Sequence, residues 1–428
     1  MPRSARPLRS LFTSPVSLLA LALAFAPIAC GDDGGGGDEI ADGSDTDGTD
    51  GSDSGTETDT GGPDRDALIA ELSAPGPYAA GYRELDLSYL PPGEMEERVL
   101  PVRVWYPAAA DSGAGPVTYT LAGIVQLPSP AALDNPPVAA DGPFPVVVYT
   151  HGSGGDGLLA YPYAERFASH GWVVFSPSHT GNTASDAFSG QTDSFLKIAV
   201  RRPLDVRAVL DEADKGFAGD EVAAATDMSR VFLFGHSFGG YTTFVVGGAA
   251  LDYQQFLDGC VLDECDYLAE PEVIDAFAEG FADPRIDAIA PQAPVLIGFA
   301  EGTLAQMPVP AMLQSGAKDI TTPDSTEAIP AWEELANPED RWIHLLDGAH
   351  YSFITVCDDL DPELLNLFQP SNTMDGCGPD FTPVSELVPM LGTYLMAYAR
   401  LHVLGEAWWA PLLEGESLHA DVELVLHE

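Results

Sequence analysis

The stretch Val231-Phe-Leu-Phe-Gly-His-Ser-Phe-Gly-Gly-Tyr241 decides the fold that we predict for this chain. Residues 231–234 form an apolar run, which is typical of a short strand covered on both faces of a sheet. Gly235, Ser237 and Gly239 follow in the spacing G-x-S-x-G, which indicates a sharp turn from that strand into a helix. The positions two before and two after the serine must lack bulk, because the strand and helix backbones pass closely there. The stretch therefore predicts an α/β fold in which the hydroxyl of Ser237 projects from the sheet.

The five-residue pattern by itself is a weak signal. Chance would produce G-x-S-x-G roughly 0.3 times in a glycine-rich chain of this length. A glycine-rich structural turn is therefore the alternative, and partner residues elsewhere must decide. A serine hydroxyl needs a histidine base at neutral pH, and this base needs an acid, in the chain order serine, acid, histidine.

Among the nine histidines, His350 fits the base best. It lies in a glycine-containing loop directly after the strand predicted over residues 341–346. A loop histidine without a role is the alternative. The other eight lie in the turn itself, in a second glycine-rich loop, before the serine, inside a strand or near the C-terminal end: His236, His151, His170, His179, His344, His402, His419 and His427.

The acid should lie at the carboxyl end of a strand between the serine and the histidine, where it can orient the imidazole. Asp319 meets this condition, because it follows the strand predicted over residues 309–314. Glu301 and Asp324 are weaker rivals, and Asp287 precedes its strand and so lies at the wrong end.

A second glycine-rich loop, Thr150-His-Gly-Ser-Gly-Gly155, follows the strand predicted over residues 145–149. It is similar to the H-G-G-G loops that supply a backbone N–H to a developing oxyanion. We expect the N–H groups of Ser153 and Phe238 to be the two donors, and the helix after the turn to add a partial positive charge. A plain strand-to-helix turn is the alternative reading of this loop.

Strands and helices alternate along the rest of the chain, which predicts a mostly parallel sheet covered by helices on both faces. Edge strands are expected over residues 82–89 and 99–106, followed by a Pro- and Ala-rich connection from 107 to 143. Residues 176–191 are expected to form a loop. Further strands are predicted over 172–175 and 286–290, and helices over 163–170, 201–213, 241–250 and 383–404.

A small cap insertion is expected over residues 251–285. Val273, Phe277, Ala278 and Phe281 recur there at helical spacing, a stripe that suits core packing or docking better than a mobile lid. Arg202 and Asp205, on the helix predicted over 201–213, are expected to be structural charges.

Several motifs together resemble one neighbourhood of the α/β-hydrolase superfamily, which contains platelet-activating-factor acetylhydrolases, cutinase-like bacterial polyester hydrolases and predicted dienelactone hydrolases. The resemblance spans about residues 80–404 and implies a serine esterase with Ser237, Asp319 and His350 as its triad. Dienelactone hydrolases have a cysteine in place of Ser237, and the animal acetylhydrolases carry their acid after an earlier strand, so the substrate stays open. The matching motifs are Gly235-His-Ser-Phe-Gly-Gly240, His151-Gly-Ser-Gly-Gly155, Ser178-His-Thr-Gly-Asn182, Arg202-Pro-Leu-Asp205, Gly316-Ala-Lys-Asp319 and Gly348-Ala-His350.

The N-terminal 30 residues are typical of an export signal. Three arginines precede the apolar segment 16–26, which is too short to span a membrane, and the segment ends in Pro27-Ile-Ala-Cys30. This ending resembles a bacterial lipobox, so we expect Cys30 to be acylated and to become the mature N-terminus; ordinary signal cleavage is the alternative.

An acidic stretch of Asp, Gly, Ser and Thr follows the signal and is too polar to fold. Part of it, residues 45–51, resembles a fragment of a calcium loop but lacks the late bidentate Glu. We therefore divide the chain into a signal peptide (1–30), a disordered linker (31–74) and a catalytic domain (75–428).

The remaining four cysteines form an even set, which suggests disulfides in an exported protein. Three pairings are possible, and proximity in sequence favours Cys260 with Cys265 and Cys357 with Cys377. Buried free thiols in a reducing compartment are the alternative, and the cysteines lack the spacing of a zinc site.

These features predict an exported or lipid-anchored serine hydrolase of carboxylic esters that needs no metal and no cofactor. The net charge of −48 disfavours nucleic acid as a partner, and a membrane contact is expected through the lipid anchor alone. Cleavage of amide or peptide bonds on the same fold, or an inert surface binding protein, are the alternatives. The oligomeric state is open.

Overall fold

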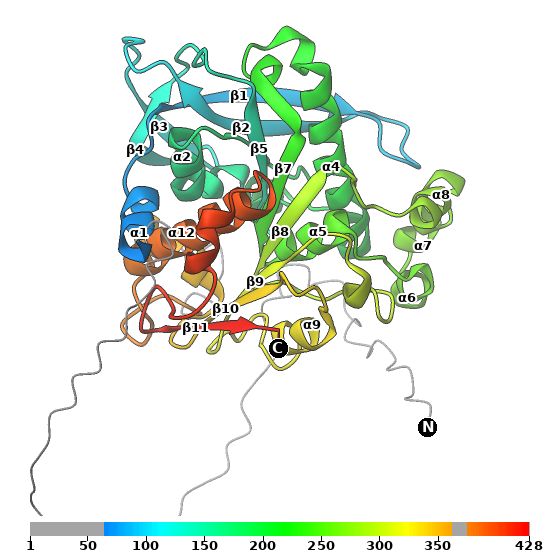
Figure 1. Cartoon of the computed structure of the whole chain (residues 1–428). Coiled ribbons are helices and arrows are strands. Elements are labelled where there is room, and N and C mark those ends of the chain that lie inside the picture. The colour runs from blue at the N-terminus through cyan, green and yellow to red at the C-terminus, as the bar shows by residue number, and fades with distance from the viewer. Residues whose placement is uncertain (1–63, 362–374, 428) are drawn as a thin grey trace, which may run out of the picture.

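The computed structural model describes residues 64–361 and 375–427. These residues build one eleven-stranded sheet in the order β11-β10-β9-β8-β7-β5-β6-β2-β1-β4-β3 (Figure 1). Its strands are β1 Ala79–Tyr89, β2 Arg98–Ala108, β3 Pro116–Leu121, β4 Val125–Asp134, β5 Phe144–Thr150, β6 Val173–Pro177, β7 Thr226–His236, β8 Ile286–Gln292, β9 Met312–Gly316, β10 Arg341–Leu345 and β11 Val422–Leu426.

Helices cover both faces of the sheet (Figure 1). Buried side chains of α1, α2 and α12 share one hydrophobic core with the sheet, and those of α4, α5 and α9 share a second core on the other face. The α-helices of the described residues are α1 Arg65–Ser73, α2 Tyr161–Ser169, α3 Ala184–Ser189, α4 Phe195–Lys215, α5 Phe238–Gly247, α6 Tyr253–Gly259, α7 Asp263–Leu268, α8 Pro271–Glu279, α9 Ala328–Glu334, α10 Val356–Asp359 and α12 Val384–His402. None of them is long and apolar enough to cross a bilayer.

The middle of the sheet is parallel. Strands β6, β5, β7, β8, β9 and β10 pair in parallel, and β5 is buried along its whole length, as its continuous apolar run predicts. Because parallel strands end at the same edge of a sheet, the loops after β5, β7, β9 and β10 meet there. These are the four loops in which the sequence places its candidate functional residues.

The prediction that residues 31–74 form a disordered linker is wrong at its C-terminal end. Residues 65–73 form helix α1, in which Leu68 and Leu72 are buried against the core that contains α12. The apolar residues of this short segment supply the buried surface that the acidic stretch lacks. The predicted signal peptide, Cys30 and the linker up to residue 63 lie outside the described residues.

The predicted connection from 107 to 143 is also wrong, because it contains the hairpin of β3 and β4. Alternate residues of β3, beginning with Val117, are buried, and the turn residues Ala122 and Gly123 both have positive φ, at 50° and 74°. Two consecutive residues of positive φ are typical of a tight hairpin turn. The hairpin places β3 at the edge of the sheet, so β1 and β2 are interior strands and not the predicted edge strands.

Helix α3 and strand β11 are among the other elements that were not predicted. Helix α3 lies in the segment predicted as the loop 176–191, where Thr183 caps its first turn through a capping box with Asp186. Strand β11 pairs antiparallel with β10 and closes the opposite edge of the sheet.

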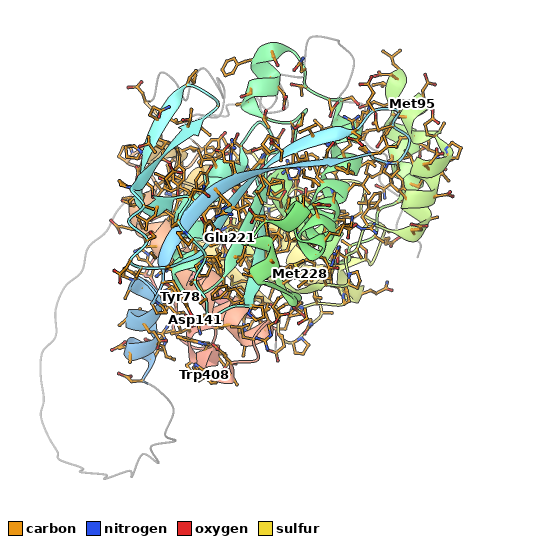
Figure 2. All side chains as sticks on the ribbon, turned by 90° about the horizontal axis from the view of Figure 1, so that it is seen from above. Tyr78, Met95, Asp141, Glu221, Met228 and Trp408 are labelled. Carbon is orange, nitrogen blue, oxygen red and sulfur yellow. A yellow bond between two sulfur atoms is a disulfide. The ribbon has the colours of Figure 1, made fainter. Side chains whose placement is uncertain are left out.

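The cap consists of α6, α7 and α8, beside α5 (Figure 1). Val273 and Phe281 are buried in a core shared with α4 and α5, and Phe277 packs against it. These three residues of the predicted stripe pack as expected, but Ala278 is exposed, so the prediction is wrong at that position. The loop between β1 and β2 reaches this cap: Gly93 lies against Val273, and the nearby Met95 is 96% exposed (Figure 2).

Both predicted cysteine pairs are confirmed. Cys260 and Cys265 are bonded within the cap. Cys357 and Cys377 join α10 to the chain that precedes α12.

Candidate active site

Ser237 occupies a sharp turn between β7 and α5. Its backbone has φ 59° and ψ −119°, a conformation that costs a non-glycine residue about 1–3 kcal/mol and persists only where its surroundings enforce it. The turn is held from outside, since Ser237 N donates a hydrogen bond of 2.8 Å to the carbonyl oxygen of Gln292 at the end of β8.

The glycines on either side of Ser237 are required by the approach of β5. A Cβ atom at Gly239 would lie 1.8 Å from the carbonyl oxygen of Thr150, and one at Gly235 would lie 2.4 Å from Thr150 Cγ2. The spacing G-x-S-x-G therefore reflects the contact of the elbow with the end of the neighbouring strand.

Replacing Gly239 with alanine is expected to lower the free energy of unfolding by about 3 kcal/mol or more, because the rigid backbone of β5 cannot move away. Gly115→Ala is the matched control, since a Cβ there meets nothing within 4 Å. Thermal denaturation followed by circular dichroism measures both, and equal Tm values for the two variants would refute the steric account.

The structure brings Ser237, His350 and Asp319 into one hydrogen-bonded row. His350 Nε2 lies 3.0 Å from Ser237 Oγ, and His350 Nδ1 lies 2.9 Å from Asp319 Oδ2. His350 is 3% exposed and Asp319 is 5% exposed. Asp319 also accepts hydrogen bonds from the N–H and the hydroxyl of Thr322, at 2.7 and 2.8 Å.

The electrostatics of this row favour a charged imidazole beside a charged carboxylate. Burial, the largest effect, opposes the charge on His350, but the charge and hydrogen bond of Asp319 outweigh it and raise the pKa of His350. Burial likewise opposes the charge on Asp319, yet His350 and Thr322 hold the pKa of Asp319 below its usual range. This is the pair of charge states that forms when an imidazole takes a proton from a serine.

The other acidic candidates have different surroundings, and Glu301 is exposed, away from the buried ring of His350. Asp324 accepts a hydrogen bond of 2.8 Å from His344 Nε2. Asp287 accepts one of 2.8 Å from the N–H of Val231. Asp319 is thus the acid among the four candidates that contacts the predicted base.

His236, next to Ser237 in the chain, fixes the histidine loop. Its Nε2 lies 2.7 Å from the carbonyl oxygen of His350. Burial and the neighbouring His350 lower the pKa of His236 to about 3, so this ring is neutral, and its Nε2 carries the proton that the carbonyl accepts.

The glycine loop after β5 lies directly against the elbow. A Cβ at Gly152 would lie 3.2 Å from Ser237 Cβ, so the backbone that leads to Ser153 passes the hydroxyl closely. Asn182 makes two hydrogen bonds to this loop. Its side-chain Nδ2 donates one of 3.0 Å to Ser153 Oγ, and its backbone carbonyl oxygen accepts one of 3.1 Å from Gly154 N.

Arg202 contacts residues next to both predicted oxyanion donors. The fully buried guanidinium donates to the carbonyl oxygen of His151 and, at 2.9 Å, to Asn182 Oδ1. It also lies 5.2 Å from the centre of the Phe238 ring, so Arg202 contacts the supports of both donors. Burial lowers the pKa of Arg202 to about 9, although nearby Asp205 acts in the opposite direction.

Asp205 holds the other end of this buried network. It accepts hydrogen bonds from Arg98 Nε at 2.7 Å, from the Tyr89 hydroxyl at 2.5 Å and from His179 Nδ1 at 2.8 Å. The prediction that Arg202 and Asp205 are structural charges fits these contacts, but it missed that the network ends at the glycine loop.

Asp375 was missed by sequence reasoning. Asp319, His350 and Asp375 each place one ligand-type atom within 4.8 Å of the others, a spacing that a metal ion could use. Both imidazole nitrogens of His350 already have partners, in Asp319 and Ser237, and both oxygens of Asp375 accept backbone N–H groups. The contacts therefore suit a proton relay better than a metal centre.

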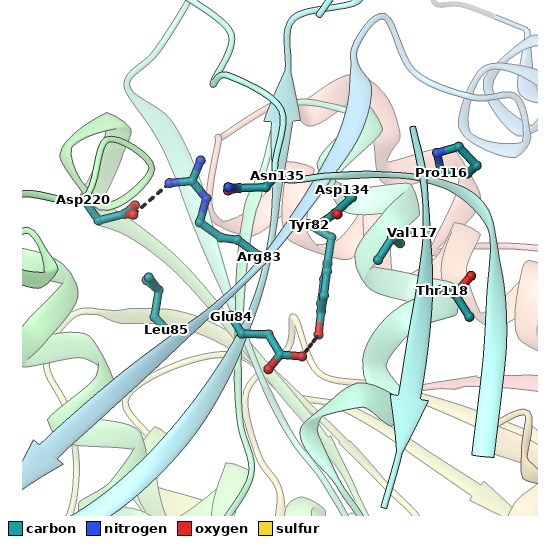
Figure 3. A pocket seen from close by; sticks show the side chains of 10 residues that line it. All are labelled: Tyr82, Arg83, Glu84, Leu85, Pro116, Val117, Thr118, Asp134, Asn135 and Asp220. Carbon is teal, nitrogen blue, oxygen red and sulfur yellow. Dashed lines mark hydrogen bonds and ion pairs between the residues drawn. The ribbon is translucent and has the colours of Figure 1, made fainter. Parts of the chain in front are cut away.

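One cavity of about 570 Å³ lies away from this row, among β1, β3 and β4 (Figure 3). Its lining includes Arg83, which donates 2.8 Å to Asp220 across the cavity wall. The lining does not include Ser237, Asp319 or His350, so this cavity is separate from the candidate active site.

No protein-family model and no curated protein matches this chain. Among solved structures, 655 chains match it. One of them is a ferulic acid esterase from Streptomyces cinnamoneus, with a TM-score of 0.57 and 19% sequence identity over 82% of this chain and 98% of that one. At this identity the likeness concerns the fold. The parallel sheet, the helices on both of its faces and this structural match show that the chain has the α/β-hydrolase fold.

Proposed function

We propose that this protein is a serine hydrolase that cleaves carboxylic esters. The observation that carries the proposal is the buried row Ser237–His350–Asp319, with donor–acceptor distances of 3.0 and 2.9 Å, at the carboxyl edge of the sheet. Mutual geometry of this kind, rather than a sequence motif, is the criterion for a nucleophile with its base and acid.

In the proposed reaction Ser237 Oγ attacks the ester carbonyl carbon while His350 Nε2 accepts its proton. The N–H groups of Ser153 and Phe238 donate to the carbonyl oxygen as it becomes negative. Asp319 stabilises the imidazolium, which then protonates the leaving alcohol. Water, deprotonated by His350, attacks the acyl group on Ser237 and releases the acid, and the serine recovers its proton.

A substrate panel tests the proposal. The panel contains p-nitrophenyl esters of increasing acyl length, methyl ferulate, which the name of the structural neighbour suggests, and an anilide matched to the best ester. We expect hydrolysis of the esters and at least about 100-fold slower cleavage of the anilide, because the poorer leaving group raises the barrier by about 2.7 kcal/mol. Faster cleavage of the anilide would replace the proposal with an amidase, and a silent panel from folded protein would end it.

The raised pKa of His350 predicts a pH dependence. A general base must be neutral, so activity is present above the pKa of His350 and is lost as the pH falls through it. Because Asp319 raises that pKa, kcat/KM should rise with a midpoint above the ordinary histidine value of 6.5. Initial rates between pH 5 and about 9 measure the midpoint, and a midpoint below the ordinary value would contradict the assignment of His350.

We further propose that the protein is exported and anchored through an acylated Cys30. The apolar segment 16–26 and the lipobox-like ending support this proposal, as do the two disulfides, which are rare in reducing compartments. The intact mass of the mature protein tests it: a diacylated cysteine at the N-terminus is expected, and cleavage after another residue without lipid would contradict it.

A further inference from the structure

A three-residue segment, residues 375–377, connects the loop that carries the acid to the loop that carries the histidine. Asp375 is 2% exposed and follows His350 in the chain by 25 positions. Its location outside the strand ends is the reason that no sequence pattern marks it.

The side chain of Asp375 holds the acid loop. Its Oδ1 accepts a hydrogen bond of 3.2 Å from Ile320 N, and its Oδ2 accepts 2.9 Å from Thr321 N and 2.5 Å from Thr321 Oγ1. These are the two residues after Asp319, and Thr321 N also donates 2.8 Å to Asp319 Oδ1. The two carboxylates therefore share one backbone N–H.

The backbone of the same segment holds the histidine loop. The carbonyl oxygen of Asp375 accepts 2.8 Å from Tyr351 N. Gly376 has φ 109°, and a Cβ there would lie 2.9 Å from Tyr351 N, so a side chain would push this segment away from the histidine loop. Cys377 is bonded to Cys357 of α10, seven positions after His350, and this covalent link ties the segment to the histidine loop.

We propose that Asp375, kept in place by the Cys357–Cys377 disulfide, is a positioning residue that locks the acid loop onto the histidine loop and places a second negative charge behind His350. The inference rests on the proposed function and deepens it. Neighbours that orient a catalytic group matter because small displacements of reacting groups are costly, up to about 100-fold in rate for 1 Å.

The charges around His350 give the sign of the expected effect. Asp319 and Asp375 both raise the pKa of His350, and together they outweigh the opposing effect of burial. His236 packs against its ring at 4.8 Å between centroids and is neutral, and the buried Tyr351 contacts it from the next position. Glu327, the N-cap residue of α9, also lies near Asp319: burial, with a further contribution from the charge of Asp319, raises the pKa of Glu327 to about 7. Loss of the Asp375 charge should therefore lower the pKa of His350.

The charge state of Asp375 follows from its partners. Burial and the charge of Asp319 raise the pKa of Asp375, but all three of its side-chain contacts are donors, and donors stabilise a carboxylate. These donors therefore oppose the rise and favour the charged form, in which Asp375 acts on His350.

The first test compares Asp375→Asn with Asp340→Asn. Asp340 is fully buried and accepts backbone N–H groups from Ala311 and Asn337, which makes it a matched carboxylate away from the row. Asp375→Asn should lower kcat/KM by up to about 100-fold on the alkaline plateau and move the midpoint of its pH profile downward. Asp340→Asn should leave the midpoint unchanged.

The second test uses the disulfides and does not depend on folding of the Asp375 variant. Cys357→Ser/Cys377→Ser should also lower the midpoint, because the segment that carries Asp375 is released. The cap pair Cys260→Ser/Cys265→Ser is the control, which loses a disulfide but should keep the wild-type midpoint. If the Cys357–Cys377 disulfide had a purely structural role, its loss would lower Tm, as loss of the cap disulfide would, but the midpoint of the pH profile would not change.

An NMR titration of the His350 ring in wild type and Asp375→Asn separates this inference from the proposed function, because it needs no turnover. A lower imidazole pKa in the variant is expected even if no ester is hydrolysed. The inference would be overturned if the Asp375→Asn and Cys357→Ser/Cys377→Ser variants kept wild-type activity and if their titration curves and pH profiles superimposed on those of the wild type.

Discussion

Ser237→Ala is expected to lower kcat for ester hydrolysis by about 10⁶-fold, since the serine of such a triad acts as a unit with its base. The variant loses the nucleophile and keeps the elbow, because the strained backbone is fixed by Gln292 and by the close approach of Thr150. Initial rates on the best p-nitrophenyl ester, with a circular dichroism spectrum to establish the fold, measure the effect.

Ser88→Ala is the control for this variant. Ser88 lies on β1 and donates 2.8 Å to Glu97 on the surface, so its hydroxyl should not affect turnover. If folded Ser237→Ala kept more than about 1% of the wild-type rate, a loss of less than 2.7 kcal/mol in transition-state stabilisation, another group would have to be the nucleophile.

Asp319→Asn should lower kcat by about 10⁴-fold, the effect known for removal of the charge in a triad of this geometry. The asparagine amide can present its N–H₂ to His350 Nδ1, which favours the imidazole tautomer with its proton on Nε2. That proton faces Ser237 Oγ, 3.0 Å away, so the ring could no longer accept the serine proton. Steady-state kinetics at a pH above the wild-type midpoint measure the loss.

Asp324→Asn tests whether position, rather than any loss of charge in this loop, causes the effect. Asp324 lies five residues further on and pairs with His344 at 2.8 Å. We expect kcat close to the wild-type value for this control. A similar loss for the two variants, or a loss below 10-fold for Asp319→Asn, about 1.4 kcal/mol, would remove Asp319 from the proposed row.

The row at the edge of the sheet could be predicted because each member has a local signature at the end of a strand. Ser237 follows an apolar run and is framed by glycines, and Asp319 and His350 follow later strands in glycine-containing loops. Parallel strands bring such loops together whatever lies between them. The sequence therefore indicated which residues meet, without any information on the distances.

The supports of this row could not be predicted in the same way. Asp375 lies in no strand or helix, and its partners at Ile320 and Thr321 are 54–55 positions away. In the sequence Arg202 looks like an ordinary charged residue on a helix. No neighbouring residue in the sequence indicates that its side chain is fully buried beneath the glycine loop. Such contacts depend on the tertiary packing of segments whose local patterns are unrelated.

Composition misled the prediction at two places. Helix α1 follows the acidic stretch directly, and its two buried leucines are too few to change the average of the window. The hairpin of β3 and β4 lies in a Pro- and Ala-rich segment, and β4 contains Pro128 and Pro130. Proline is tolerated near a sheet edge, where a missing N–H leaves fewer ladder bonds unmade.

The central claim is that Ser237 is a nucleophile activated by His350, and covalent labelling tests it most directly. Folded wild-type protein is incubated with a fluorophosphonate, and the intact mass and the modified peptide are determined beside Ser237→Ala. We predict one adduct per chain, on the peptide that contains Ser237, and no adduct in the variant. Equal labelling of both proteins, or no labelling of folded wild type, would contradict the account.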